Sequence, residues 1–263
     1  MLTAPEEPFV ELEHVFVARC AKVVLHDLSL RIAAGEHVAI LGPNGCGKST
    51  LIKTLTCECY PVADPPSRLR IFGRERWEIF ELRKRLGVVE PNLPGRSTLH
   101  ARGRDVVLSG FFASSSIWPA MRVTATMRER ADVALAQMEA LHLAEKEIAE
   151  MSAGEARRVL IARALVHAPR VLLLDEPSNA LDLAAQDELR RVLRALARQG
   201  TGILLVTHHL ADVLPEIKRV VLLREGRIVG DGPKEEMLTE QRLGELFGVR
   251  VSLARRDGFY HVW

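Results

Sequence analysis

The chain has 263 residues, of which 48% are hydrophobic and 27% charged, a balance that favours a globular protein with a sizeable core. Lysine and arginine number 36 against 34 acidic residues, and a formal charge of +2 argues against a strongly basic nucleic-acid binder. The beginning of the sequence lacks the features of a secretory signal, and no apolar run approaches the roughly 20 residues that span a bilayer. If the protein works at a membrane, we expect another chain to cross it.

The four cysteines, Cys20, Cys46, Cys57 and Cys59, have no spacing typical of a disulfide framework. We therefore expect free thiols in a reducing compartment. Cys57 and Cys59 could hint at a metal, but no second pair of ligands follows at zinc-site spacing, and this disfavours metal binding there.

Alternating apolar residues predict an antiparallel β portion within the first forty residues, with Val10, Leu12 and His14 on one face. The apolar run 37–41 ends at a glycine loop, and 48–55 has apolar residues at helical spacing. Strand, glycine loop and helix in this order predict a place where phosphate could bind.

Helical patterns with intervening turns follow from about residue 76 to 150, for example at 127–143. Helix and strand patterns then alternate: helices at 156–167 and 184–199, strands at 171–175, 203–207 and 219–223. Such alternation is typical of a parallel sheet covered on both faces. Gly232 and Pro233 predict the start of a further helix, and 249–263 is polar and aromatic without an evident role.

The loop at 42–50, GPNGCGKST, fits the phosphate-binding pattern G-x-x-x-x-G-K-[ST]. Its glycines let backbone N–H groups converge on phosphate oxygens, the lysine neutralises them, and the serine hydroxyl faces Mg²⁺. The candidate nucleotide-binding residues here are Gly42, Asn44, Gly45, Cys46, Gly47, Lys48, Ser49 and Thr50.

The apolar strand 171–175 ends in two adjacent carboxylates. Asp175 can hold Mg²⁺ through water, and Glu176 can orient or deprotonate an attacking water. Buried strands often end in an acidic residue, so this pattern gains its weight only from the phosphate loop before it.

A second candidate anion site is the segment Met151–Val159, in which Ser152 and Gly154 precede a helix N-terminus. The alternative is an ordinary helix cap by Ser152, with Glu155 three residues later as in a capping box. Such a cap does not exclude phosphate binding from a neighbouring subunit.

Phosphate loop, serine–glycine segment, paired carboxylates and a following histidine occur in an order that resembles the ATP-binding cassette (ABC) ATPase family. The resemblance covers about residues 9–247. The family's leucine-serine-glycine-glycine-glutamine motif corresponds to residues 151–155 here, with the phosphate-contacting Ser152 and Gly154 matched and Glu155 at the glutamine. It further implies that Asp182 communicates between two sites and that His208 reaches the γ-phosphate, whereas His209 has no such role.

Two positions depart from the family's pattern. Arg19 stands where an aromatic ring usually stacks on adenine, and its planar guanidinium can stack instead. Pro91 stands where a glutamine usually reaches Mg²⁺. Glu90 is the nearest oxygen donor, and it either substitutes as a metal ligand or stays solvated beside a metal that keeps its waters.

The expected fold is therefore α/β: a P-loop NTPase core with a mainly parallel sheet flanked by helices, an N-terminal antiparallel β portion and an inserted helical subdomain. We expect one ABC ATPase domain, with the nucleotide-binding core at 1–75 and 160–250, the helical subdomain at about 76–159 and a C-terminal tail at 251–263.

The resemblance implies an ATPase whose cofactors are ATP and Mg²⁺, with Lys48, Glu176 and His208 as catalytic residues and Ser49, Asp175 and Glu90 at the metal. It also implies a head-to-tail homodimer on ATP binding, integral membrane permease subunits as partners, and a cytoplasmic location at the inner face of the membrane through that permease. Nucleic acid is not expected as a partner.

The segment 106–112 and the stretch around 246–249 resemble ATPase subunits of metal-chelate importers, such as those for iron-siderophores or cobalamin. The alternative is a soluble ABC ATPase that acts on DNA or ribosomes, or in regulation. Such proteins usually have a long coiled coil, zinc-binding cysteines or two cassettes in one chain, and none is evident here. A GTPase is disfavoured because no guanine-reading asparagine-lysine-x-aspartate sequence occurs.

Overall fold

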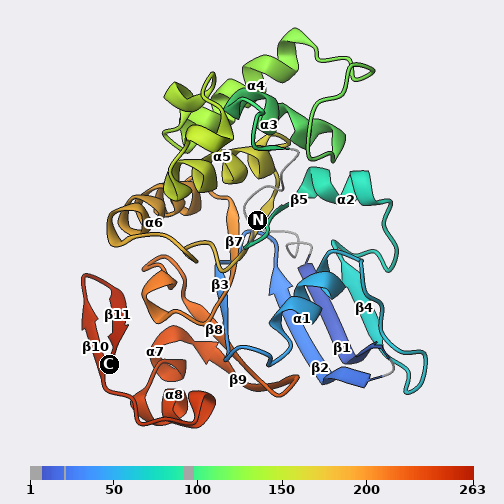
Figure 1. The fold of residues 1–263 in the computed structure, drawn as a ribbon. Helices are drawn as coiled ribbons and strands as arrows, with labels where there is room; N and C mark the ends of the chain where they lie inside the picture. The colour runs from blue at the N-terminus through green and yellow to red at the C-terminus, as the bar shows by residue number, and fades with distance from the viewer. Residues whose placement is uncertain (1–7, 21, 92–97) are drawn as a thin grey trace, which may run out of the picture. The chain divides into compact units, whose positions relative to one another are not determined.

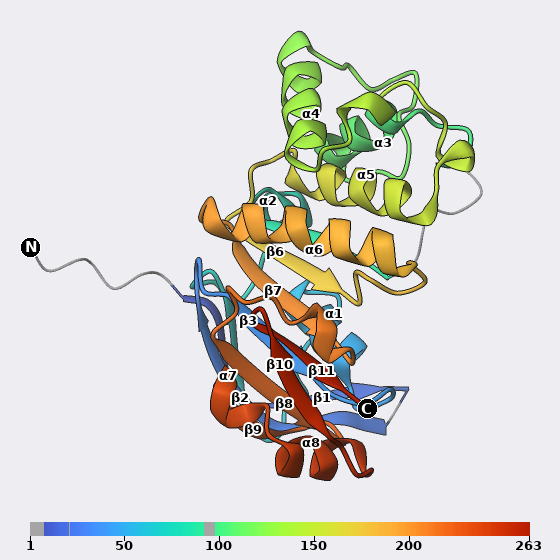
Figure 2. The ribbon, with the colours of Figure 1, turned by 90° about the vertical axis from the view of Figure 1, so that its left-hand side faces the viewer.

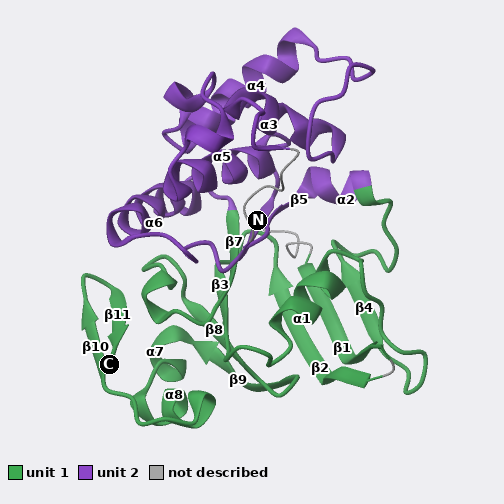
Figure 3. Ribbon diagram, viewed as in Figure 1, with its two compact units in different colours: residues 1–79, 202–263 green, residues 80–201 purple. Residues whose placement is uncertain are grey.

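The computed structural model describes residues 8–20, 22–91 and 98–263. The chain divides into two compact units (Figure 3): unit 1 comprises Met1–Ile79 and Gly202–Trp263, and unit 2 comprises Phe80–Thr201. Each unit has its own strands and helices and is described by itself.

Unit 1 begins with a three-stranded antiparallel sheet in the order β2-β1-β4 (Figure 1), made of β1 (Pro8–Arg19), β2 (Lys22–Ala33) and β4 (Arg68–Ile71). Val10, Leu12 and Val15 are buried in it. The β1–β2 register shifts between Leu12 and Val15, where His14 has a φ of 52° and is exposed. The expectation that His14 shares a face with Val10 and Leu12 was therefore wrong, because an irregularity interrupts the strand alternation at this point.

The second sheet region of unit 1 is mainly parallel. β3 (Val38–Leu41) pairs in parallel with β7 (Gly202–Thr207) on one side and β8 (Arg219–Arg224) on the other, and β9 (Arg227–Pro233) is antiparallel to β8. Every residue of β3 and β7 is buried, as continuous apolar runs predict for strands covered on both faces. Helix α1 (Lys48–Leu55) follows β3 and contacts β1 and β2.

The C-terminal part of unit 1 consists of α7 (Lys234–Met237), α8 (Glu240–Phe247) and a hairpin of β10 (Leu253–Arg256) and β11 (Phe259–Val262). Pro233 caps α7 and also ends β9, so the helix expected after it is a single turn. No role for this tail is evident from the sequence, but β11 packs against the short helix η5 (Leu210–Asp212). The hairpin thus supports the segment that follows β7.

Unit 2 contains two parallel strands, β5 (Leu86–Val89) and β6 (Val171–Asp175), paired with Val89 opposite Leu174. Its helices are α2 (Ile79–Arg85), α3 (Gly103–Ser109), α4 (Ala125–Gln137), α5 (Ala153–Leu165) and α6 (Leu183–Arg198). Helix α5 contacts α3, α4, α6 and β5, and Figure 2 shows it between α6 and the other two helices. It is therefore the central helix of this unit.

Local sequence explains where the helices of unit 2 begin and end. In α6 the buried residues Leu189, Val192, Leu193 and Leu196 recur every three or four positions, as an amphipathic helix requires. Asp182 caps its N-terminus, because the carboxylate accepts a hydrogen bond from Ala185 N at 2.8 Å. Helix α4 ends at Gln137 rather than continuing to 143 as expected, and Glu139 has a positive φ of 51°.

Parallel strands flanked by helices and an N-terminal antiparallel sheet are what the sequence predicted for the fold class. No helix among residues 8–20, 22–91 and 98–263 is both long and apolar enough to cross a membrane.

Candidate nucleotide-binding site

The phosphate loop of unit 1 connects the buried strand β3 to helix α1, as the sequence predicted. Gly42 has no room for a side chain, because a Cβ there would lie 2.3 Å from the Leu223 backbone oxygen. Gly47 has a φ of 109°, which favours glycine, and a Cβ there would lie 2.8 Å from a methyl group of Leu25. Two glycines of the motif are therefore required by the fold of the loop itself.

Lys48 opens α1, and its side chain folds back over the loop. Its ammonium donates hydrogen bonds to the backbone oxygens of Gly42 at 2.8 Å and Pro43 at 3.0 Å, and the residue is only 6% exposed. A buried ammonium needs such partners, since charge removed from water is costly when uncompensated. The cation is thus held at the loop by the loop's own carbonyl groups.

The remaining candidates in the loop differ in exposure. Asn44, Gly45 and Ser49 are exposed, whereas Thr50 is buried and its carbonyl accepts a hydrogen bond from the Thr54 hydroxyl at 2.9 Å. The exposed Ser49 hydroxyl lies in the first turn of α1, where the predicted metal ligand was expected.

Cys46 is 5% exposed, and its Sγ would lie 2.6 Å from a Cβ at Gly42. Its carbonyl accepts a hydrogen bond from Gly226 N at 2.8 Å, and the Gly226 carbonyl accepts one from His26 N at the same distance. These contacts tie the loop to the β8–β9 turn and to β2. The role of Gly226 was not found from sequence, although a glycine in a tight hairpin turn was the available signal.

His208 follows β7 directly and is half-buried, with its ring 3.8 Å from that of the exposed His209, measured between centroids. Thr207 holds the segment after β7 in place. Its hydroxyl donates to the Asp212 carboxylate at 3.2 Å and accepts from His209 N at 3.0 Å. Thr207 and Asp212 are both buried. The supporting pair Thr207 and Asp212 was not predicted from the sequence, and the role of His208 stays a prediction.

Arg19 ends β1 beside the turn to β2, pairs with Lys22 in the register, and is exposed. Its guanidinium therefore lies at the surface of unit 1, as a side chain that stacks on a ligand must. Stacking of Arg19 on adenine stays a prediction.

In unit 2, Asp175 ends β6 and is buried at 9% exposure, and the half-buried Glu176 follows it. Glu176 has a φ of 44°, a left-handed conformation that is uncommon for residues other than glycine. Its carbonyl accepts a hydrogen bond from Asn179 N at 3.1 Å, so the chain turns sharply after the strand.

Ser152 and Glu155 form the capping box considered from sequence. The Ser152 hydroxyl accepts from Glu155 N at 3.2 Å, and the Glu155 carboxylate accepts from Ser152 N at 2.8 Å. Lys146 also donates to Glu155 at 2.9 Å, and these hydrogen bonds lower the pKa of its carboxyl group. Gly154, between them, is buried. The cap is present, and it orders the helix start on which the serine–glycine segment depends.

Glu90 is exposed and follows β5, and Pro91 is half-buried. The buried Arg157 of α5 donates to the backbone oxygens of both residues. Sequence reasoning missed Arg157, although an arginine among the apolar residues of a helix, three positions after Gly154, was a usable signal.

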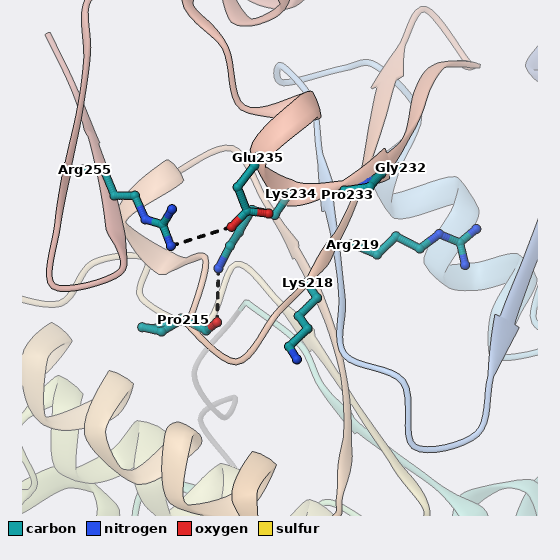
Figure 4. Close-up of a pocket in the computed structure, with 8 residues that line it drawn as sticks. All are labelled: Pro215, Lys218, Arg219, Gly232, Pro233, Lys234, Glu235 and Arg255. Atoms are coloured by element: carbon teal, nitrogen blue, oxygen red, sulfur yellow. Dashed lines mark hydrogen bonds and ion pairs between the residues drawn. The ribbon is translucent and has the colours of Figure 1, made fainter.

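A separate cavity of about 640 Å³ in unit 1 has basic walls but none of the candidate residues (Figure 4). Of its lining cations, Lys234 donates to the Leu214 and Pro215 oxygens, and Arg255 lies 3.6 Å from Glu235. Arg219 is bonded to Asp231 and Glu36 and points away from the others in Figure 4. Three of the four cations that line this cavity thus already interact with other groups of the protein.

A glycine loop between a buried parallel strand and a helix, closed by its own lysine, defines a P-loop nucleotide-binding protein. Comparison with known proteins then narrows the class. The family model described as ABC transporter matches residues 25–179. The chain therefore belongs to the ABC transporter family as an ATP-binding cassette, and it is an ATPase that binds ATP.

Several relatives cover nearly the whole chain. Hemin import ATP-binding protein HmuV of Aliivibrio fischeri is 34% identical over 237 residues, which are 87% of this chain and 86% of that protein. A solved structure described as a metal-chelate type ABC transporter in an inward-facing conformation is 26% identical, with a TM-score of 0.80 over 98% of this chain and 97% of that one.

A second similar structure is the ATP-binding cassette MJ0796, solved as a dimer in a post-hydrolysis state with ADP and Pi. It is 26% identical, with a TM-score of 0.68 over 85% of this chain and 98% of that one.

Proposed function

We propose that this protein is the ATP-hydrolysing subunit of an importer for a metal chelate, and that it drives transport through separate integral membrane permease subunits. The observation that carries the proposal is its match, over most of both lengths, to a protein named as a hemin import ATP-binding protein. The structural similarity to a transporter of the metal-chelate type supports the same substrate class. The protein then works at the cytoplasmic face of the membrane, held there by its permease.

For ATP binding, the glycine loop supplies backbone N–H groups from Gly45 and Gly47, and Lys48 places positive charge on the β- and γ-phosphates. Asn44, Cys46 and Thr50 contribute through the loop that carries them, and Arg19 stacks on adenine. Because Lys48 already spans the loop carbonyls, binding exchanges these neutral acceptors for phosphate oxygens, which are stronger partners.

For hydrolysis, Glu176 orients and deprotonates the attacking water, and His208 donates to the γ-phosphate. The donor set fits Mg²⁺, since an exposed serine hydroxyl and a carboxylate at a strand end are the hard oxygen ligands that it prefers. Ser49 and Asp175 would hold the metal, with Glu90 as a further candidate. When bound, Mg²⁺ neutralises charge that develops on the phosphates.

We propose further that two copies associate head to tail around two ATP molecules, with Ser152, Gly154 and Glu155 of one copy at the γ-phosphate bound by the other. Asp182 then communicates between the two sites. The capping box orders the start of α5, where the helix dipole favours an anion, and it does not exclude phosphate binding from the other copy. The dimeric structure of the MJ0796 cassette supports the association of two copies.

Glu176→Gln tests hydrolysis and dimerisation together. The amide keeps the shape of the side chain but cannot act as a base, so ATP should bind while turnover falls by about two orders of magnitude or more. Light scattering should then show a dimer with ATP and a monomer without nucleotide. A variant that stays monomeric with saturating ATP would contradict the dimer.

Transport is tested by tagging the chain in its native host and identifying what co-purifies. A polytopic permease should be recovered, and the pair in proteoliposomes should import hemin or another metal chelate when ATP is present on the cassette side. Lys48→Ala serves as the inactive control. Recovery of ribosomes or DNA without a permease would instead favour a soluble ABC ATPase.

A further inference from the structure

Arg157 is one of the largest fully buried side chains of the protein, with 1% of its surface exposed. It lies on α5, three residues after Gly154. Its Nη1 donates to the Glu90 backbone oxygen at 2.7 Å, and its Nη2 donates to the Pro91 backbone oxygen. One guanidinium thus holds two consecutive carbonyl groups of the loop that follows β5.

This arrangement is costly unless it serves the loop. Burial lowers the pKa of Arg157, an effect that attraction to Asp175 partly opposes. Its Nε has no hydrogen-bond partner in the part of the chain that the structure describes. A buried cation with an unsatisfied donor destabilises a fold relative to an apolar residue of similar size. The stabilisation of the Glu90–Pro91 backbone is therefore the feature that offsets the cost.

The Glu90–Pro91 loop lies at the same edge of the sheet as the candidate metal ligand Asp175. Val89 and Leu174 are partners in the parallel β5–β6 pair, so Glu90 and Asp175 both follow at the same edge. Neighbouring strands lie about 4.8 Å apart, which places the two backbones side by side. Arg157 bonds to the first and responds to the charge of the second.

Pro91 cannot hold this loop in place through its own side chain or backbone N–H. Its side chain has no donor or acceptor and its nitrogen no hydrogen, so it offers other groups only its carbonyl. Arg157 uses that carbonyl. A fork of two N–H donors fixes the direction of both peptide groups, which a single-point lysine does not.

We propose that Arg157 is a positioning residue for ATP hydrolysis: it fixes the Glu90–Pro91 loop to the start of α5 and beside Asp175, in place of the side chain that Pro91 lacks. The proposal rests on the ATPase activity alone and not on transport. Movement of α5 then moves the Glu90–Pro91 loop, and movement of the loop moves α5.

The chain offers a matched control in the next residue. Arg158 is also buried, at 6% exposure, and its Nε is likewise unsatisfied among the described residues. It donates to the Glu139 oxygen at 3.0 Å and pairs with Glu188, so it holds a different part of unit 2. Arg157→Met and Arg158→Met therefore remove equivalent groups from the same helix, and Arg157→Lys keeps the charge but loses the fork.

The experiment compares wild type with Arg157→Met, Arg157→Lys and Arg158→Met, at a temperature at which each is folded by circular dichroism. Steady-state ATPase assays give kcat and KM, and hydrogen–deuterium exchange follows the peptide containing Leu86–Pro91. Arg157→Met should lower kcat by about tenfold, or ~1.4 kcal/mol, with KM for ATP within about threefold of wild type. It should also speed exchange in that peptide, and Arg157→Lys should be intermediate.

Arg158→Met should leave exchange in the Leu86–Pro91 peptide at the wild-type rate. The proposal is overturned if Arg157→Met keeps the wild-type kcat while only its melting temperature falls. It is also overturned if both methionine variants change exchange and kcat alike, since the effect would then be general loosening of α5. If Arg157→Met does not fold, Arg157→Lys decides the question. A wild-type kcat and wild-type exchange of the Leu86–Pro91 peptide in Arg157→Lys would show that the two-donor contact of the guanidinium is not needed.

Discussion

Gly154 of α5 lies directly against Ala185 of α6, so closely that a Cβ on the glycine would come within 2.7 Å of the alanine Cβ. Both residues belong to the first turn of their helices, and the caps of these helices are Ser152 and Asp182. The start of α5, proposed to contact the γ-phosphate, and the start of α6, capped by Asp182, thus meet in one close contact within unit 2. The Ala185 side chain is a single methyl group, so it has no other rotamer into which it could move aside.

Gly154→Ala should therefore destabilise the protein, although alanine is ordinarily the better helix former by about 1 kcal/mol. Overpacking of this kind costs about 1–3 kcal/mol, so we expect a net loss of ~1 kcal/mol and a reduced ATPase rate. Urea unfolding and steady-state assays measure the two effects. Ala185→Gly in the same chain opens the space and should restore much of both. If the single variant is as stable as wild type, the close contact does not exist in solution.

Lys48→Ala should lower ATP affinity by at least about a hundredfold, because it removes the cation that the loop holds for the phosphates. It also leaves the buried Gly42 carbonyl without its ammonium donor, a cost of about 1 kcal/mol to the unliganded fold. Isothermal titration measures affinity, and thermal unfolding without ATP measures stability. Lys53→Ala, in the last turn of the same helix, is the control and should bind like wild type. Unchanged affinity in Lys48→Ala would refute the site.

The features that the sequence predicted well depend on residues that lie close together in the chain. The strand before the phosphate loop is a continuous apolar run, and a buried parallel strand requires such a run. The capping box at Ser152 and Glu155 is a contact across one helical turn, so its residues stand three apart in any sequence that has it.

The features that were missed depend on contacts between distant segments. Arg157 meets Glu90 across a separation of 67 residues, and no local pattern shows which buried carbonyl an arginine reaches. The C-terminal hairpin packs on η5, and the polar sequence of the tail does not indicate this tertiary contact. His14 was misplaced because strand alternation carries no sign of a register shift.

The four cysteines should react with iodoacetamide in two groups. Cys20 is exposed and Cys59 half-buried, so both should be modified within minutes, whereas the buried Cys46 and Cys57 should be slow. Burial also raises the pKa of the Cys57 thiol and so reduces its reactive thiolate. Bound ATP should slow only Cys46 further, since Cys46 alone lies in the phosphate loop, and its alkylation should block ATP binding. Mass spectrometry of timed samples decides, and equal labelling of Cys46 with and without ATP would reject its place at the nucleotide.

The capping box should make stability depend on pH through Glu155. Hydrogen bonds from Lys146 and from Ser152 N lower the pKa of this carboxyl group below its ordinary value of 4.5. A depressed folded pKa means that the unfolded chain takes up the proton first as the pH falls. The contribution is therefore complete above about pH 4.5 and is lost as the pH falls through the folded pKa.

Glu155→Gln isolates this effect, because glutamine can still accept the hydrogen bond from Ser152 N but has no charge for Lys146. At pH 7 the variant should be less stable by about 0.5–1 kcal/mol, a value kept small by solvent screening of a partly exposed pair. Urea unfolding at intervals from pH 7 to pH 3.5 should show the two proteins converging as the pH falls. Glu150→Gln, at an exposed carboxylate just before the helix, controls for the loss of one negative charge near the start of α5. A difference between wild type and Glu155→Gln that stays constant over this range would mean that the Glu155 charge does not stabilise the start of α5.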